Sequence, residues 1–202
     1  MTKVKVCGLK RKEDIFYANE LKPDYVGFVF AKSKRQIDMY KAKKLIDYLD
    51  SSIKTVGVFL NTPIYKVKEI SSFCNLDILQ LHGDETPEYC SVFDKELWKA
   101  FRVKNRDSLK ELDQYYTNGY LLDTYVKGTY GGTGEAFNWD LASEVSKKKF
   151  IILAGGLLED NIDMAIDSVK PNIVDVSSGV ETNGFKDFSK MKKFIERVRK
   201  II

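Results

Sequence analysis

Two hydrophobic patterns alternate along the whole chain. Short apolar runs, typical of buried strands, are followed by segments whose apolar residues recur every three or four positions, as on one face of a helix. The expected strands cover residues 3–9, 24–30, 54–60, 78–83, 97–103, 119–123, 150–156 and 172–179. The expected helices cover residues 11–21, 39–49, 108–115, 139–146, 161–168 and 188–198, with two more opening at Pro63 and near Pro87. These strand–helix repeats predict a parallel sheet, because parallel neighbours need a crossover helix between them.

The even number and regular spacing of the repeats favour closure of the sheet into a barrel. Strand–helix units in this number are the composition of the (β/α)8 TIM barrel, an α/β fold. An open, doubly wound sheet is the structural alternative, but the first strand–helix turn, Cys7-Gly-Leu-Lys10, lacks the glycine fingerprint of a dinucleotide-binding fold. No linker or low-complexity segment interrupts the pattern, so we expect residues 1–202 to form a single (β/α)8 domain.

Composition narrows the partners that such a barrel would have. The chain is 44% hydrophobic and 31% charged, and no run approaches the ~18 apolar residues of a membrane span. Its net charge of +4 comes from lysines spread over nearly every segment, which favours a solvated lysine-rich surface over a nucleic-acid footprint. We therefore expect neither a membrane nor a nucleic acid as partner. A modest positive field would still attract an anionic metabolite.

Cysteine usage indicates the compartment. Cys7, Cys74 and Cys90 have no metal-type spacing, and their odd number argues against a disulfide framework. Residues 1–20 also lack the apolar core of a signal peptide. We expect a reducing cytoplasm and no metal site.

Cys7 differs from the other two cysteines in its position. Cys74 and Cys90 fall within expected helices, where a cysteine is usually a small buried hydrophobe. Cys7 stands where a strand ends, beside Gly8. As a thiolate it could act as a nucleophile or a base, provided that neighbouring donors or cations bring its pKa toward neutrality. His82 is the single histidine of the chain, which argues against a protease-like Cys–His pair elsewhere.

Asp123 ends the expected strand 119–123, directly after Leu121 and Leu122. A carboxyl group beside apolar side chains favours its neutral form, and a neutral carboxyl can donate a proton as a general acid. The alternative is an aspartate that caps a helix or satisfies a turn. The glycine-rich segment 128–134 favours the first interpretation, because such loops often close over reacting sugars and phosphates.

Glycine-containing turns after the last two expected strands predict a phosphate site. Ala154-Gly-Gly156 and Ser177-Ser-Gly179 could present backbone N–H groups to an anion, and TIM barrels often bind phosphate at these two loops. The alternative is that the glycines only make tight turns. Their place after adjacent strands favours phosphate, and the absence of a Walker-type lysine from the sequence argues against a nucleoside triphosphate.

Seven motifs, taken together, resemble a known enzyme family. They are Lys5-Val-Cys-Gly-Leu9, Gly57-Val-Phe-Leu-Asn61, Leu79-Gln-Leu-His-Gly-Asp-Glu85, Leu121-Leu-Asp123, Tyr130-Gly-Gly-Thr-Gly134, Ala154-Gly-Gly-Leu157 and Val174-Asp-Val-Ser-Ser-Gly-Val-Glu181. In this order they resemble the phosphoribosylanthranilate isomerases of tryptophan biosynthesis, over residues 3–199. Cys-Gly after the first strand, combined with Leu-Gln-Leu-His-Gly after the fourth, is the most specific part, since many phosphate-binding barrels contain Ala-Gly-Gly.

The resemblance implies an Amadori rearrangement that opens N-(5-phosphoribosyl)anthranilate into a ribulose phosphate derivative, without metal or cofactor. Asp123 resembles the family's general acid, which protonates the ribose ring oxygen. Cys7 resembles its general base, which removes the C2 proton from the resulting iminium. The implied partner is a small phosphosugar substrate, and a monomer and a weak homodimer both remain open.

The same resemblance implies substrate-binding residues. Arg35 resembles the arginine that meets the anthranilate carboxylate, although the segment before it, Ala31-Lys-Ser-Lys34, lacks the proline often found there. The residues that resemble phosphate-binding turns are Gly155, Gly156, Ser178 and Gly179. His82 either orients the substrate or anchors its loop. Asp175 either reaches a substrate hydroxyl or belongs to a hydrogen-bonded layer inside the barrel.

Some features depart from the family or admit another function. Glu135 and Asn138 stand where a lysine and an aspartate are commoner, which bears on loop closure. One alternative function is a related isomerase of histidine biosynthesis, which has an aspartate in place of Cys7; the thiol argues against it. Another is a barrel that binds a phosphate ligand without turnover, and the presence of an acid, a base and both phosphate turns argues against that.

Overall fold

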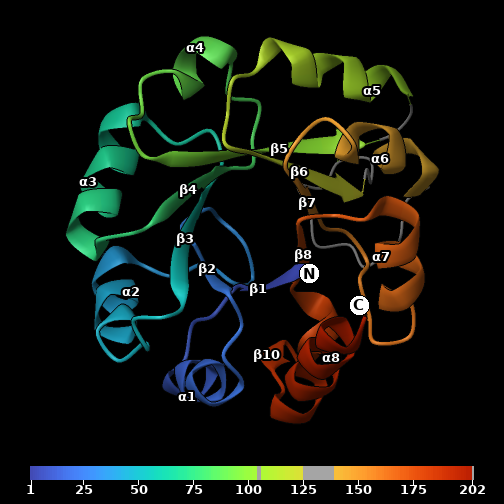
Figure 1. Ribbon diagram of the computed structural model, residues 1–202. Helices are drawn as coiled ribbons and strands as arrows, with labels where there is room; N and C mark the ends of the chain where they lie inside the picture. The colour runs from blue at the N-terminus through green and yellow to red at the C-terminus, as the bar shows by residue number, and fades with distance from the viewer. Residues whose placement is uncertain (104–105, 125–138, 202) are drawn as a thin grey trace.

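The apolar runs of the sequence form the strands of a closed barrel (Figure 1). The computed structural model describes residues 1–103, 106–124 and 139–201. Within these residues the barrel strands are β1 (Lys3–Cys7), β2 (Tyr25–Val29), β3 (Lys54–Phe59), β4 (Ile78–Leu81), β5 (Glu96–Val103), β6 (Gly119–Thr124), β7 (Ile151–Leu153) and β8 (Ile173–Val176). Each strand pairs in parallel with the next, and β8 pairs with β1, so the sheet has no free edge. The expected (β/α)8 barrel is confirmed.

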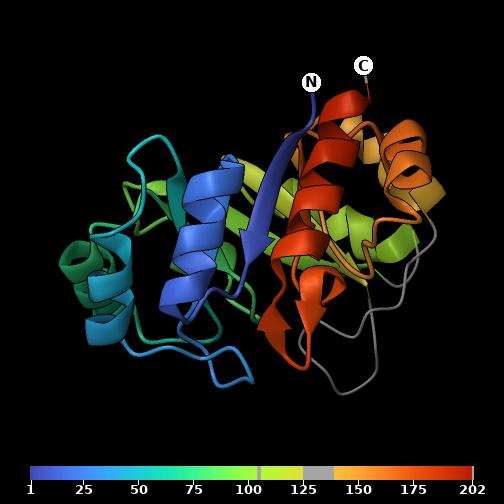
Figure 2. The same ribbon diagram turned by 90° about the horizontal axis from the view of Figure 1, so that it is seen from below.

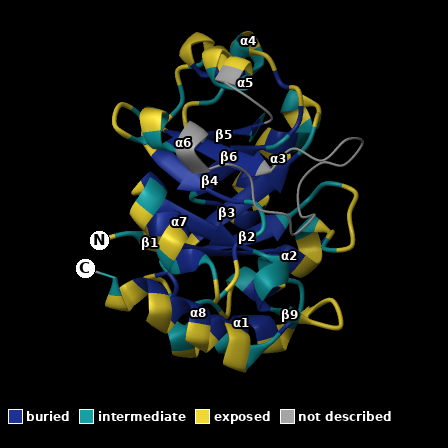
Figure 3. Cartoon of the chain, turned by 90° about the vertical axis from the view of Figure 1, so that its right-hand side faces the viewer, coloured by how far each residue is buried: buried dark blue, intermediate teal, exposed yellow. Residues whose placement is uncertain are grey.

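Helices surround the barrel and cover its outer surface (Figure 1). They are α1 (Lys12–Leu21), α2 (Met39–Ile46), α3 (Ile64–Cys74), α4 (Pro87–Cys90), α5 (Arg106–Lys110), α6 (Trp139–Ser146), α7 (Ile162–Val169) and α8 (Phe188–Lys200). In Figure 3 the strands are buried, whereas the outward faces of the helices are exposed. In α8, for example, Met191, Phe194 and Val198 are buried at helical spacing. No helix among the described residues is long and apolar enough to cross a membrane.

Strand alternation divides the apolar core into two layers. Side chains that point outward pack between the sheet and the helices in the larger cluster, which includes Val6, Phe28 and Phe59. A second cluster has a member from each strand from β2 to β8 and fills the barrel interior. Its members are Tyr25, Val56, Ile78, Trp98, Ala100, Leu121, Ile152, Ala154 and Ile173. The barrel is therefore a packed core at this level, not a pore.

Trp98 is the largest side chain of the inner cluster. It is fully buried, and its ring meets that of Tyr25 edge-on at 5.2 Å between centroids. Its Nε1 donates to Glu96 Oε1 at 3.0 Å. Gly119 on the next strand leaves the space that the indole occupies, since a Cβ there would lie 2.7 Å from the ring.

The structure departs from the sequence predictions mainly in its loops. The helix expected at residues 108–115 is the short α5 followed by a 3₁₀ turn, Glu111–Gln114. The strand expected at 172–179 ends at Val176, and a 3₁₀ turn, Ser178–Val180, follows. Pro63 is the N-cap of α3 rather than its first residue. The glycine-rich segment 128–134, Glu135 and Asn138 lie outside the described residues.

A hairpin after β8 was not predicted. It consists of β9 (Glu181–Thr182) and β10 (Phe185–Lys186), paired antiparallel. Asn183 and Gly184 make its turn with φ of 53° and 77°, the left-handed conformation that an Asn-Gly pair adopts in two-residue hairpins. Figure 2 shows this red hairpin at the end of the barrel opposite the two chain termini. It therefore lies at the carboxyl ends of the strands.

The packing of Trp98 generates a stability prediction. Replacing it with alanine removes the indole from a closed interior that has little room to collapse, so Trp98→Ala should lower the free energy of unfolding by about 3–5 kcal/mol. Urea denaturation followed by circular dichroism measures this. Tyr116→Ala is the control, because Tyr116 is 97% exposed and its loss should change stability by no more than ~0.5 kcal/mol. A loss below about 1 kcal/mol in Trp98→Ala would contradict a tightly packed interior.

Candidate active site

Strand periodicity aims a set of polar side chains into the mouth of the barrel. Leu121 and Ile173 belong to the inner apolar cluster, and side chains two positions further along a strand share the same face. Those positions hold Asp123 on β6 and Asp175 on β8, and both are buried. Polar groups thus replace apolar ones towards the carboxyl ends of the strands, where TIM barrels carry their active sites.

An ion pair between Lys5 and Asp175 crosses from β1 to β8. The two residues are partners in the strand register, and Lys5 Nζ donates to Asp175 Oδ2 at 2.7 Å. Lys5 is fully buried. Burial lowers the pKa of Lys5, but the attraction of Asp175 outweighs it, so the pKa is raised and the lysine stays charged. Asp175 Oδ1 is buried without a hydrogen-bond partner in the structure described.

Cys7 lies two residues beyond Lys5, at the end of β1, and is 8% exposed. Gly27 on β2 leaves room for the thiol, since a Cβ there would lie 2.7 Å from Cys7 Sγ. Burial raises the pKa of the Cys7 thiol, while the positive charges of Lys5 and Lys186 lower it and Asp175 opposes them. The cations that a thiolate needs are therefore in place, but the net pKa shift is upward, opposite to the direction that a resting thiolate requires.

Arg35 reaches the same end of the barrel from the loop after β2. Its side chain lies over Gly8, where a Cβ would come within 2.5 Å of Arg35 Cδ. One edge of its guanidinium is held by Glu181: Nε donates to Oε1 at 2.7 Å and Nη2 to Oε2 at 2.8 Å. Lys186 Nζ also donates to Glu181 Oε1, at 2.7 Å. Burial raises the pKa of Glu181, but these two cationic partners outweigh it and lower the pKa to about 2.

Glu181 and Lys186 were not identified from the sequence. Both belong to the unpredicted hairpin, and Lys186 is buried although lysines usually lie in solvent. Besides Glu181, Lys186 Nζ donates to the carbonyl oxygen of Ser177 at 2.9 Å. The Asn-Gly dipeptide at 183–184 was the one feature that could have indicated this hairpin.

Asp123 is joined to His82 on the opposite side of the mouth. His82 Nε2 lies 3.2 Å from Asp123 Oδ2, and His82 Nδ1 lies 3.0 Å from Gln80 Nε2. Gln80 is buried, and its Oε1 has no hydrogen-bond partner in the structure described. Asp175 interacts electrostatically with both Asp123 and His82. It therefore links the Asp123 side of the mouth with the Lys5–Cys7 side.

A second buried ion pair fixes the loop that carries His82. Glu85 accepts hydrogen bonds from the backbone N–H of Asn61 at 2.8 Å and of Gly83 at 2.9 Å. Lys99 Nζ lies 3.3 Å from Glu85 Oε2 and donates to the carbonyl oxygen of Gly83 at 2.7 Å. Both side chains are buried, so the loops after β3 and β4 are tied to β5 by charged hydrogen bonds.

The two turns predicted to bind phosphate lie against each other. Gly155 and Gly156 have φ of 87° and 65°, which favour glycine. A Cβ on Gly179 would lie 2.1 Å from the carbonyl oxygen of Leu157, so the turns after β7 and β8 are in backbone contact. Ser178 begins the 3₁₀ turn that follows β8. Gly155, Gly156, Ser178 and Gly179 thus come together at the carboxyl end of the barrel.

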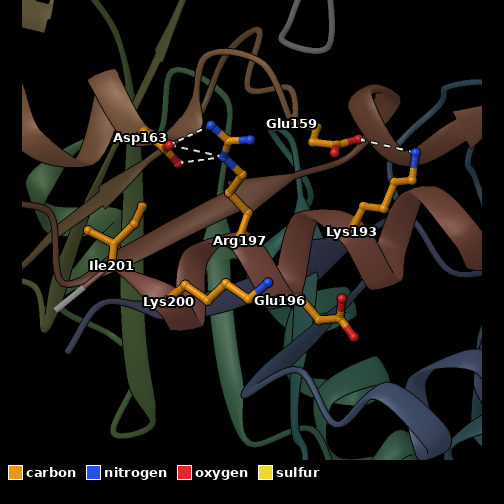
Figure 4. Close-up of a pocket in the computed structure, with 7 residues that line it drawn as sticks. All are labelled: Glu159, Asp163, Lys193, Glu196, Arg197, Lys200 and Ile201. Atoms are coloured by element: carbon orange, nitrogen blue, oxygen red, sulfur yellow. Dashed lines mark hydrogen bonds and ion pairs between the residues drawn. The ribbon is translucent and has the colours of Figure 1, made fainter.

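A surface pocket of about 390 Å³ between α7 and α8 lies apart from these residues (Figure 4). Its lining is Glu159, Asp163, Lys193, Glu196, Arg197, Lys200 and Ile201. Arg197 and Asp163 are paired at 2.6 Å, and Lys193 and Glu159 are paired at 4.0 Å. These charges satisfy one another, and none of the predicted site residues takes part.

Comparisons with known proteins agree with this geometry. Residues 4–197 match the family model described as N-(5'phosphoribosyl)anthranilate (PRA) isomerase. An N-(5'-phosphoribosyl)anthranilate isomerase of a Thermoanaerobacter species is 56% identical over 202 residues, with all of both chains covered. That of Clostridium acetobutylicum is 55% identical over 203 residues, with 99% of each chain covered.

Solved structures of the same enzyme family are also similar to this chain. The phosphoribosyl anthranilate isomerase of Thermotoga maritima superposes with a TM-score of 0.90 at 36% identity, covering 98% of this chain and 99% of its own. A phosphoribosyl anthranilate isomerase in complex with reduced 1-(o-carboxyphenylamino)-1-deoxyribulose 5-phosphate has a TM-score of 0.87 at 34% identity, with the same coverage. The match of fold, motifs and length shows that this chain belongs to the N-(5'-phosphoribosyl)anthranilate isomerase family.

Proposed function

We propose that this barrel rearranges N-(5'-phosphoribosyl)anthranilate into 1-(2-carboxyphenylamino)-1-deoxyribulose 5-phosphate, with Asp123 as general acid and Cys7 as general base. One observation carries the assignment of roles. A buried carboxyl group and a buried thiol lie at the same end of the barrel, Asp123 at the end of β6 and Cys7 at the end of β1, and both interact electrostatically with Asp175. An aldose–ketose isomerisation needs one proton donor and one proton acceptor on the same sugar, and this pair supplies them.

The acid step opens the ribose ring. Asp123 gives a proton to the ring oxygen, the bond from that oxygen to C1 breaks, and the anthranilate nitrogen lone pair forms an iminium with C1. The barrier falls because the leaving oxygen departs as a hydroxyl instead of an alkoxide. Asp123 is buried at the carboxyl end of β6, so this proton transfer would take place away from bulk solvent.

The base step forms the new ketone. The iminium acidifies the C2–H bond, Cys7 takes that proton, and the bonding pair moves to make an enolamine and neutralise the nitrogen. Tautomerisation then moves the hydroxyl proton of the enolamine to C1 and leaves a ketone at C2. Cys7 accepts this proton as a thiolate, after its own proton has passed to solvent. The iminium is a cation formed next to it, so it adds to Lys5 and Lys186 in favouring that ionisation.

The remaining residues would hold the two ends of the substrate. Glu181 occupies only the Nε/Nη2 edge of Arg35, which leaves the Nη1/Nη2 edge for the substrate carboxylate. The phosphate would bind the backbone N–H groups of the two contacting turns that contain Gly156 and Gly179. Asp175 Oδ1 is a buried acceptor without a partner in the structure described, which suits a substrate hydroxyl. These contacts suit a small phosphosugar as substrate. The three cysteines are free thiols, which suits an enzyme of the reducing cytoplasm.

Asp123→Asn tests the acid. The amide keeps the shape of the side chain but has no acidic proton, so kcat should fall by ~10²–10⁴-fold while KM changes little. Loss of the anthranilate fluorescence of the substrate follows turnover. A kcat near that of the unmodified chain would remove Asp123 from the role of acid.

Cys7→Ser tests the base. A hydroxyl has a much higher pKa than a thiol, so this variant should also lose ~10²–10⁴-fold in kcat. Cys74→Ser is the matched control, because Cys74 lies at the end of α3 and should leave turnover unchanged. Full activity in Cys7→Ala would show that another group removes the C2 proton.

The ionisation of Cys7 can be followed directly in a Cys74→Ala, Cys90→Ala background, in which it is the sole thiol. Burial favours the neutral thiol, so the ultraviolet absorbance of the thiolate should grow only as the pH rises through a pKa above the ordinary thiol value. Adding Lys5→Met together with Asp175→Asn removes both members of the ion pair, so neither charge is left buried alone. Lys5 favours the thiolate more than Asp175 disfavours it, so the net effect is a loss of thiolate stabilisation. The midpoint should then move to still higher pH. A midpoint at neutral pH, or a downward move, contradicts this electrostatic account.

A further inference from the structure

His82 is held at both ring nitrogens by side chains of the barrel interior. Gln80 lies two residues earlier on β4 and contacts Nδ1 at 3.0 Å, and Asp123 on β6 contacts Nε2 at 3.2 Å. The His82 side chain is 14% exposed, and Gln80 is buried. A ring with a partner at each nitrogen has a defined tautomer, because each partner either donates or accepts.

The Gln80 amide decides which nitrogen of His82 carries the proton. The amide nitrogen is a donor only, so it must face a lone pair on Nδ1. A neutral imidazole with its lone pair on Nδ1 carries its proton on Nε2. That proton then points at Asp123 Oδ2.

We infer that Gln80 is a positioning residue for the acid step, which holds the proton of the His82 imidazole on Nε2, so that His82 donates to Asp123. This inference rests on the proposed role of Asp123 and adds two residues to it. Because Oδ2 accepts from His82, the acidic proton of Asp123 is confined to Oδ1. When that proton leaves, the hydrogen bond from Nε2 stabilises the carboxylate that forms.

The opposite tautomer would work against the acid. With the proton on Nδ1, His82 Nε2 would present a lone pair to Asp123 and accept the proton intended for the sugar oxygen. Turning the Gln80 amide by 180° would place Oε1 against Nδ1 and select that tautomer. The two arrangements therefore predict different protonation of the same ring, and a measurement on the ring separates them.

Several charged side chains surround His82. Asp175 interacts with His82 electrostatically and is itself paired with Lys5 at 2.7 Å. Arg102, the register partner of Asp123 on β5, is paired with Asp84 from the loop after His82.

A third ion pair near His82 joins Glu85 to Lys99 at 3.3 Å, and Lys99 also donates to the carbonyl oxygen of Gly83. Each of these acidic groups has a cationic partner, whereas the Gln80 amide contacts the ring itself. Gln80 is therefore the group whose replacement should change the tautomer.

Nuclear magnetic resonance can read the tautomer directly, because His82 is the single histidine in the sequence. In the uniformly ¹⁵N-labelled chain at neutral pH, two-bond ¹H–¹⁵N correlations should show Nε2 with the shift of a protonated nitrogen and Nδ1 with that of an unprotonated one. The reverse pattern, or two protonated nitrogens, overturns the inference without any measurement of turnover.

Gln80→Glu is the informative variant. A carboxylate at this position accepts instead of donating, so Nδ1 should gain a proton, and kcat should fall by roughly 10- to 100-fold. Gln80→Met keeps the volume without a hydrogen bond and should give mixed tautomers with a smaller loss of kcat. Gln114→Glu makes the same chemical change at an exposed site and should alter neither readout. Unchanged ring shifts in both Gln80→Glu and Gln80→Met would contradict the inference.

The failure of this inference can be told apart from the failure of the proposed function. If Asp123→Asn loses turnover but the ring carries its proton on Nδ1, the assignment of Asp123 as the acid is supported and the positioning role of Gln80 is rejected. If the ring carries its proton on Nε2 but Asp123→Asn remains active, Asp123 is not the acid, and the positioning of His82 has no bearing on catalysis.

Discussion

The mouth of this barrel depends on one buried ion pair. Lys5 and Asp175 lie 170 residues apart in sequence, yet they are register partners on strands that closure of the sheet makes neighbours. Two charges in a low-dielectric interior are tolerated only when they satisfy each other. Below them the interior is apolar and packed, and above them it is polar. The pair sets this boundary and places a positive charge beside Cys7 and a negative one near Asp123.

The proposed base and the proposed acid lie in different environments. Cys7 is a buried thiol flanked by two lysines, so its ionisation responds to any positive charge that forms beside it. Asp123 is a buried carboxyl group whose Oδ2 lies 3.2 Å from Nε2 of His82. The hairpin after β8 adds Glu181 and Lys186, which orient Arg35 and extend the charge network to the rim. In the proposed mechanism these fixed charges act on the charges that form during the reaction.

Much of the fold could be predicted from the sequence because apolar runs and helical spacing repeat without interruption. The ends of those runs also predicted Cys7, Asp123 and the paired glycine turns as candidate site residues, since a polar residue directly after a buried strand stands out, and the structure places them at the same end of the barrel. Which side chains contact one another could not be predicted. Lys5 next to valines looks like ordinary strand alternation, and only the closed register shows that it faces Asp175. Likewise, only the three-dimensional contacts show that Gln80 and His82 are paired and that His82 contacts Asp123.

A crystal structure of this chain with reduced 1-(o-carboxyphenylamino)-1-deoxyribulose 5-phosphate tests the central claim most directly. The account predicts that an Asp123 oxygen lies within about 2.6–3.2 Å of the ligand hydroxyl that derives from the ribose ring oxygen. Cys7 Sγ should face C2 at a reacting distance of about 3–3.5 Å or slightly more, given the size of sulfur. A ligand bound with its C2 away from the thiol, or with that hydroxyl far from Asp123, would contradict the assignment of acid and base.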